Sequence, residues 1–101
     1  MFIAKVIGSV VSTQKTQAMV GHRLLLIEPY ILDPASQTRL VSNHKTLVAL
    51  DTVGAGEEEY VLVVQGSSAR MTPETKTLPA DCVAIGIVDS VHVSRRAIEL
   101  Q

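Results

Sequence analysis

The sequence predicts an all-β protein: a small five-stranded antiparallel barrel of the oligonucleotide-binding type, with one short helical turn. Three observations support this fold class. Short runs of Val, Leu and Ile recur along the chain, glycines interrupt them where a barrel strand would bend, and no long stretch has helical periodicity. The chain has 101 residues, which fits a single domain spanning 1–101.

The first two strands are expected in the N-terminal third. Ile3–Thr13 is dominated by β-branched residues, and Gly8 inside it indicates a bend or bulge. A polar loop should follow over 12–21. A second, buried strand is expected over His22–Glu28, with Pro29 ending it or placing it at a sheet edge, since proline cannot donate to a ladder.

A hairpin is expected next. Asp33–Ser36 is a turn built around a proline, and Ser42–Lys45 is a second turn. Between them, Thr38–Val41 suits a short return arm. The third main strand is then predicted over Thr46–Asp51.

The stretch Ala49–Arg70 organises the rest of the chain. Its first loop contains Asp51, Gly54 and Gly56, which we interpret as a structural loop because glycine permits backbone angles closed to other residues. The fourth strand is predicted over Tyr60–Gln65. The chain then leaves the sheet through a run of small residues, which suits one capped helical turn: Gly66, Ser67, Ser68, Ala69 and Arg70.

The C-terminal third is expected to contain a loop, a strand and a tail. A polar surface loop is predicted over 71–79, between two prolines. The last long strand is predicted over Val83–Val93, interrupted by Gly86. The tail Ser94–Gln101 keeps an apolar alternation and is long enough to reach a neighbouring subunit.

The composition favours an oligomer. Hydrophobic residues make up 47% of the chain, but it has only one Phe, two Tyr and no Trp, so the core must be aliphatic. A domain of this size buries only about two-thirds of the surface that its unfolded chain exposes. Apolar surface should therefore remain outside, and such surface usually marks an interface.

Charge and cysteine content exclude several classes of partner. Nine basic and ten acidic residues give a net charge of −1, so neither nucleic acid nor an anionic membrane is an expected partner. No apolar run reaches the roughly 18 residues of a membrane helix. The single cysteine, Cys82, rules out an internal disulfide and fits a reducing compartment. We expect a cytoplasmic protein.

No motif predicts catalysis, a cofactor or a metal. His22, His44 and His92 lack metal-ligand spacing, and Cys82 begins an aliphatic strand where a small apolar side chain would pack. The serines at 67–68 have no local base, which leaves at most a weak anion contact with the arginine that follows them.

Two further patterns have a structural reading. Gly54–Gly56 resembles half of a phosphate-binding loop, but the segment after it is strand-like where such a loop requires a helix. Asp51, Asp81 and Asp89 are conceivable as an acid/base set, yet aspartates at strand ends usually cap turns. We therefore expect a protein that is not an enzyme.

Six segments, taken in order, carry a family resemblance: Ile3–Lys15, Gly21–Leu25, Asp51–Glu57, Glu59–Val63, Gly66–Arg70 and Asp81–Asp89. Together they resemble the bacterial microcompartment vertex proteins of the EutN/CcmL type. The N-terminal run is most similar to the carboxysome members. Arg23 stands where lysine is common in the family, and Tyr60 where tryptophan is frequent; the change to arginine keeps the charge but alters hydrogen-bond geometry.

The resemblance implies a homopentamer shaped as a truncated pyramid, which closes the vertices of a protein shell tiled by hexameric shell proteins. It implies a structural role in a carboxysome shell in the cytoplasm, and hence a link to carbon dioxide fixation in photosynthesis. We expect Gly66–Arg70 near the five-fold axis or pore, because small residues tolerate crowding. The alternatives are a vertex protein of an ethanolamine- or propanediol-type microcompartment, a single-stranded nucleic-acid-binding barrel, and a small-ligand module.

Overall fold

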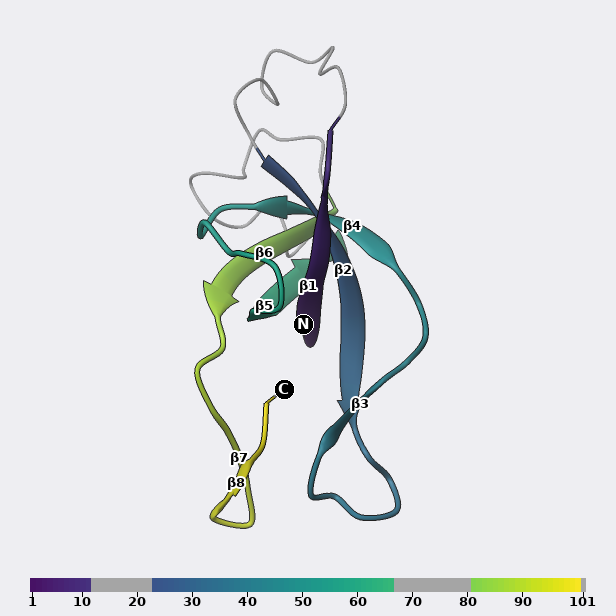
Figure 1. The fold of residues 1–101 in the computed structure, drawn as a ribbon, viewed down its shortest axis with the longest axis vertical. Coiled ribbons are helices and arrows are strands. Elements are labelled where there is room, and N and C mark those ends of the chain that lie inside the picture. The colour runs from purple at the N-terminus through teal and green to yellow at the C-terminus, as the bar shows by residue number, and fades with distance from the viewer. Residues whose placement is uncertain (12–22, 67–80, 101) are drawn as a thin grey trace.

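The computed structural model describes residues 1–11, 23–66 and 81–100, and these ranges form an all-β fold (Figure 1). The strands are β1 Phe2–Val10, β2 Arg23–Leu32, β3 Leu40–Ser42, β4 Leu47–Asp51, β5 Tyr60–Gln65, β6 Cys82–Ile87, β7 Val91–Val93 and β8 Arg96–Ile98. Five of them follow the order β1-β5-β6-β4-β2, and β2 pairs back with β1. The sheet therefore closes, which confirms the predicted five-stranded barrel.

One pair in the barrel is parallel, which corrects the antiparallel prediction at that place. β4 and β6 run side by side in the same direction, with Leu50 opposite Val83 and Asp51 opposite Ala84. The other four neighbouring pairs in the ring are antiparallel. A closed ring with an odd number of strands cannot alternate direction throughout, so one parallel pair is unavoidable.

β1 bends as the sequence indicated. Val6 pairs with Ile27 and Gly8 with Leu26, so Ile7 is the extra residue of a bulge between them. The bulge allows β1 to bend between its two partners, β5 at its start and β2 along most of its length.

Of the two outcomes expected for Pro29, the first is wrong: β2 does not end there but continues to Leu32. Pro29 lies where β2 changes its partner: the pairing with β4 ends at Ile27, and the pairing with β3 begins at Tyr30. The carbonyl of Pro29 accepts a hydrogen bond from Asn43 N at 3.1 Å. In an antiparallel strand the N and C=O of one residue point the same way, so the missing N–H falls at the junction between partners and costs no regular ladder bond.

The predicted last strand is divided in two. β6 ends at Ile87, and Val88 N donates a final bond to Tyr60 O at 2.8 Å. Because β5 begins at Tyr60, the chain beyond Val88 has no further residue of β5 to pair with. It turns away and pairs with the tail instead, forming the β7–β8 hairpin.

The turn at Asp33–Ser36 lies where it was predicted. The Asp33 carboxylate accepts bonds from Ala35 N at 3.0 Å and Ser36 Oγ at 3.2 Å, and the Arg39 side chain lies 3.2 Å from the same carboxylate. β3 then returns along β2. The β2–β3 hairpin and the β7–β8 hairpin both extend from the same end of the barrel (Figure 1).

The barrel interior is filled by small aliphatic side chains, as the composition required. Its buried cluster consists of Ala4, Val6, Leu25, Ile27, Ala49, Ala55, Val61, Val63, Cys82 and Ala84. A second buried cluster of Leu50, Val64 and Val83 lies on the other face of β4, β5 and β6, since side chains alternate along a strand.

The predicted helical turn falls mostly on residues that the structure does not describe. Gly66 directly follows β5 and has φ of 67°, a left-handed angle that suits an abrupt change of direction. Ser67–Arg70 lie outside the described residues, as do the predicted loops over 12–21 and 71–79.

Candidate functional site

The loop after β4 is organised by one carboxylate. The Asp51 side chain is only 2% exposed and accepts backbone hydrogen bonds from Val53 N at 2.9 Å, Gly54 N at 3.0 Å and Ala55 N at 3.1 Å. A buried carboxylate needs such donors, because burial of an unpaired charge is strongly unfavourable. Asp51 thus folds the loop around itself, and it is not available as an acid or base.

Arg23 joins this loop to the barrel. It lies opposite Asp51 in the β2–β4 ladder, and its Nη1 lies 3.5 Å from Asp51 Oδ2. The same nitrogen donates to Ala55 O at 2.6 Å. The arginine therefore contacts both the carboxylate and the end of the loop that the carboxylate holds.

The two loop glycines have different roles. Gly54 has φ of 72°, where a Cβ would strain the backbone. Gly56 is not in the left-handed region, and its N–H donates to Glu59 Oε1 at 2.6 Å. On the other side of the loop, Thr52 Oγ1 donates to Ala84 O at 2.7 Å, which ties the loop to β6.

A stripe of partly exposed apolar side chains crosses the outer face of the barrel. Ile7 of β1 is 40% exposed and Val48 of β4 is 48% exposed, and both neighbour Leu26 of β2, which pairs with Gly8 and with Val48. We call Ile7, Leu26 and Val48 the outer stripe. Contiguous apolar residues on the outside of a small domain indicate a contact surface.

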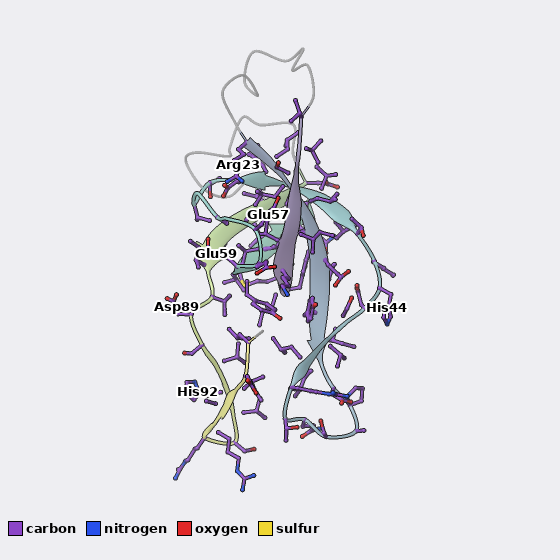
Figure 2. All side chains as sticks on the ribbon, in the orientation of Figure 1. Arg23, His44, Glu57, Glu59, Asp89 and His92 are labelled. Carbon is purple, nitrogen blue, oxygen red and sulfur yellow. The ribbon has the colours of Figure 1, made fainter. Side chains whose placement is uncertain are left out.

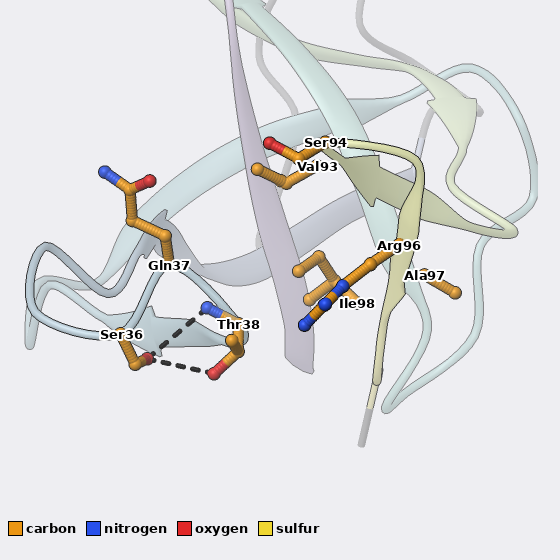
Figure 3. Close-up of a pocket in the computed structure, with 8 residues that line it drawn as sticks. All are labelled: Ser36, Gln37, Thr38, Val93, Ser94, Arg96, Ala97 and Ile98. Atoms are coloured by element: carbon orange, nitrogen blue, oxygen red, sulfur yellow. Dashed lines mark hydrogen bonds between the residues drawn. The ribbon is translucent and has the colours of Figure 1, made fainter.

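The two projecting hairpins enclose a cleft of about 380 Å³ (Figure 3). One wall is the turn Ser36–Thr38, and the other consists of Val93, Ser94 and Arg96–Ile98 of the β7–β8 hairpin. Arg96 extends across it toward Thr38, and none of the residues that line it is acidic. This site cannot be predicted from local sequence patterns, because the two walls are far apart in the chain and the turn at 94–95 contains neither Gly nor Asn.

The aromatic side chains are not arranged to stack on bases. Tyr30 and Tyr60 pack edge to face, with ring centroids 5.4 Å apart, and Lys5 Nζ lies 5.8 Å from the Tyr60 centroid. Tyr60 is only 6% exposed, and Phe2 packs against the core. Burial beside Tyr60 raises the pKa of Tyr30. A single-stranded nucleic-acid site needs exposed aromatic platforms, and all three aromatic residues are engaged elsewhere.

The remaining candidates for chemistry are dispersed. His44 and His92 lie on different parts of the molecule (Figure 2), and His22 is outside the described residues. Asp81 and Asp89 flank the two ends of β6. Within 1–11, 23–66 and 81–100, no group of three potential metal-ligating residues occurs, and no helix is long and apolar enough to cross a membrane.

Cys82 packs at the start of β6, inside the barrel cluster. Burial raises the pKa of its thiol, and the nearby Asp81 raises it further. A thiol held in its neutral form is a poor nucleophile, which is consistent with a packing role.

Comparison with known proteins gives a consistent result. A family model described as ethanolamine utilisation protein EutN/carboxysome matches residues 1–89. The carboxysome shell vertex protein CcmL of Gloeobacter violaceus is 42% identical over 98 residues, which are 97% of this chain and 92% of that protein. Its solved structure superposes with a TM-score of 0.81 and covers 100% of this chain and 98% of that one.

Two other relatives are described as shell proteins of bacterial microcompartments. The shell vertex protein PduN of Salmonella typhimurium is 43% identical over 94 residues, which are 90% of this chain and 98% of that protein. The structure of GrpN from Rhodospirillum rubrum, titled a pentameric microcompartment shell protein, has a TM-score of 0.76 at 39% identity and covers 92% of this chain and 99% of that one. The resemblance predicted from the sequence is confirmed: this chain belongs to the EutN/CcmL family.

Proposed function

We propose that the chain is a structural protein that assembles into a homopentamer and closes the vertices of a bacterial microcompartment shell. The observation that carries this proposal is the match to shell vertex proteins over almost the whole length of both partners. The wedge shape of the ring would supply curvature that a flat layer of hexameric shell proteins lacks. The function is thus geometric, and the subunit needs no catalytic group or cofactor.

The outer stripe supports assembly into a ring. Ile7 and Val48 expose apolar surface on the barrel of a single subunit. A second copy of the chain would bury this surface in the ring. Around a five-fold axis each contact is head-to-tail, so two different patches of the same chain meet. A closed ring covers both patches on every subunit.

We infer that the shell is a carboxysome shell, located in the cytoplasm. Support comes from the CcmL relatives, which are 39–43% identical over 93% or more of the chain in four organisms. A vertex role in a catabolic microcompartment is the second candidate, because PduN reaches the same identity. Isolation of shells from the source organism separates the two: the protein should co-purify with carboxysomes, and its enrichment in another compartment would contradict this assignment.

The position of the five-fold axis remains our proposal. Gly66 is exposed and left-handed at the end of β5, where a small-residue segment begins. We expect the segment Gly66–Arg70 of five subunits to line the axial opening. Electron microscopy of the purified ring tests the five-fold symmetry and the position of this segment. Five-fold averages with the segment at the centre are expected, whereas a position at the rim would contradict the assignment. Adding a hexameric shell protein to the same sample tests edge contacts.

A further inference from the structure

The turn of the β7–β8 hairpin carries an arginine in an unfavourable conformation. Ser94 and Arg95 have φ of 51° and 67°, and they connect the paired residues Val93 and Arg96. Two left-handed residues in a two-residue hairpin define a type I′ turn, for which Asn and Gly are strongly preferred. The turn therefore holds an arginine where glycine would fit with less strain, and strained positions often serve a function.

This turn lies at the edge of the cleft between the hairpins (Figure 3). The cleft offers a cation at Arg96 and hydroxyl groups at Ser36, Thr38 and Ser94. The carboxylate of Asp33, in the turn that forms one wall, is occupied by Arg39 and by its own turn. Within the described part of the chain, neither Arg95 nor Arg96 has an ion-pair partner. The cleft thus presents unneutralised positive charge, while the hydroxyls of Ser36 and Thr38 already donate within their own turn.

A segment of opposite charge, which we call the acidic segment, lies beside the loop that follows β4. Glu57 and Glu58 are exposed and form no ion pair with any described residue. Glu58 also has a left-handed φ, of 72°. Its N–H donates to Val6 O at 2.8 Å, and Glu59 O accepts from Val6 N at 2.9 Å. The backbone bonds to β1 fix where these two carboxylates emerge from the barrel.

The acidic segment and the cleft occupy separate regions of one subunit. The segment precedes β5, next to the barrel, whereas the β7–β8 turn lies at the far end of the hairpin (Figure 1). A head-to-tail ring requires two different patches that fit each other on each copy, and opposite charge is one way in which such patches are matched. We propose that the cleft of one subunit, with Arg96 in its lining and Arg95 in the adjoining turn, receives Glu57 and Glu58 of the adjacent subunit in the ring. This inference rests on the proposed pentamer and specifies one of its contacts.

A charge exchange tests the contact. The variants R95E/R96E and E57R/E58R should each raise the subunit concentration at half-dissociation by about tenfold or more, because like charges then face each other. The four-residue variant that combines them should return to within about threefold of the original value. Native mass spectrometry and light scattering on a dilution series measure this concentration, and circular dichroism checks that each variant is folded.

Two further variants make the test specific. K45E reverses an exposed cation on a different loop and should leave assembly unchanged. R95G removes the charge and also relieves the backbone strain. If Arg95 had only a local structural role, R95G would leave assembly unchanged; the proposed contact requires R95G to weaken it.

The possible outcomes separate this contact from the proposed function. A wild-type pentamer that R95E/R96E leaves intact, or a four-residue variant without rescue, would overturn the contact while the pentamer stands; the cleft would then serve another shell component. A wild-type monomer would overturn both. Loss of assembly in R95E/R96E and in E57R/E58R, together with its recovery in the combined variant, would establish the pairing.

Discussion

Arg23 and Asp51 face each other across β2 and β4, with the guanidinium nitrogen 3.5 Å from the carboxylate. The two side chains differ in environment: that of Asp51 is 2% exposed and that of Arg23 is 48% exposed. The carboxylate is therefore stabilised mainly by the loop N–H groups. The arginine contacts the carboxylate and the loop from the solvent side. This arrangement fixes the loop from which the acidic segment emerges.

Replacement of Asp51 by Ala should destabilise the subunit by about 2–4 kcal/mol, because several buried N–H groups lose their acceptor. Urea denaturation at a fixed subunit concentration measures the loss. D33A is the matched control, since it removes a partly exposed turn carboxylate and should cost much less. Equal losses in the two variants would contradict a special role for Asp51.

The Arg23–Asp51 pair should contribute little by itself. R23A removes the ion pair and also the hydrogen bond to Ala55. The ion pair is expected to account for about 1 kcal/mol or less of the lost unfolding free energy, because Arg23 is half exposed and solvent screens the pair. A double-mutant cycle with D51N measures the coupling directly. A coupling energy above about 3 kcal/mol would show that the arginine, and not the loop N–H groups, is the main partner of the carboxylate.

The two loop glycines should respond differently to substitution. Valine at Gly54 should cost about 1–3 kcal/mol, because the residue would be held at φ of 72°. Alanine at Gly56 should cost less, since a Cβ there would only contact the flexible Glu59 carboxylate, at 3.4 Å. Denaturation of both variants provides the comparison. Unchanged stability in G54V would show that the loop geometry is wrong.

The outer stripe should be essential for assembly. V48D places a charge in the stripe and should convert rings into smaller species while the barrel stays folded, because Val48 is 48% exposed in the single subunit. I31D is matched in exposure, also 48%, but lies outside the stripe. Size-exclusion chromatography and circular dichroism should show dissociation for V48D only. Dissociation of both variants to the same extent would deny the stripe a specific role.

Cys82 should be protected from thiol reagents at neutral pH. Its pKa is raised above the ordinary 9.0 by burial and by Asp81, so the neutral thiol persists in the folded state. The native protein should react about tenfold or more slowly than the unfolded chain. As pH rises through the unfolded pKa, only the unfolded thiol ionises, so stability should fall there; C82A should lose this part of the pH dependence. Equal reaction rates would contradict the burial of Cys82.

Local patterns predicted much of the barrel. The strand Tyr60–Gln65 was predicted with the boundaries that the structure has, because Tyr60 follows polar residues and Gly66 ends the run. The bulge beside Gly8 was likewise foreseeable, since a glycine within a run of β-branched residues often marks a bulge. In both cases the determining interactions are close in sequence.

Features that depend on distant partners were missed. Pro29 is tolerated only because β2 changes partner beside it, which its neighbours in sequence do not reveal. The strand predicted over Val83–Val93 stops because its partner β5 starts at Tyr60, which is remote from Ile87 in the chain. Arg23 and Asp51 are paired by the ladder and not by spacing. Local propensity cannot specify which strand ends beside which.

The mass of the purified assembly tests the central claim most directly. Multi-angle light scattering across a dilution series should give a value near five times the 10.9 kDa of the chain, because the exposed apolar stripe needs a cover and the related GrpN is described as pentameric. A stable monomer, or a six-membered ring, would contradict the account.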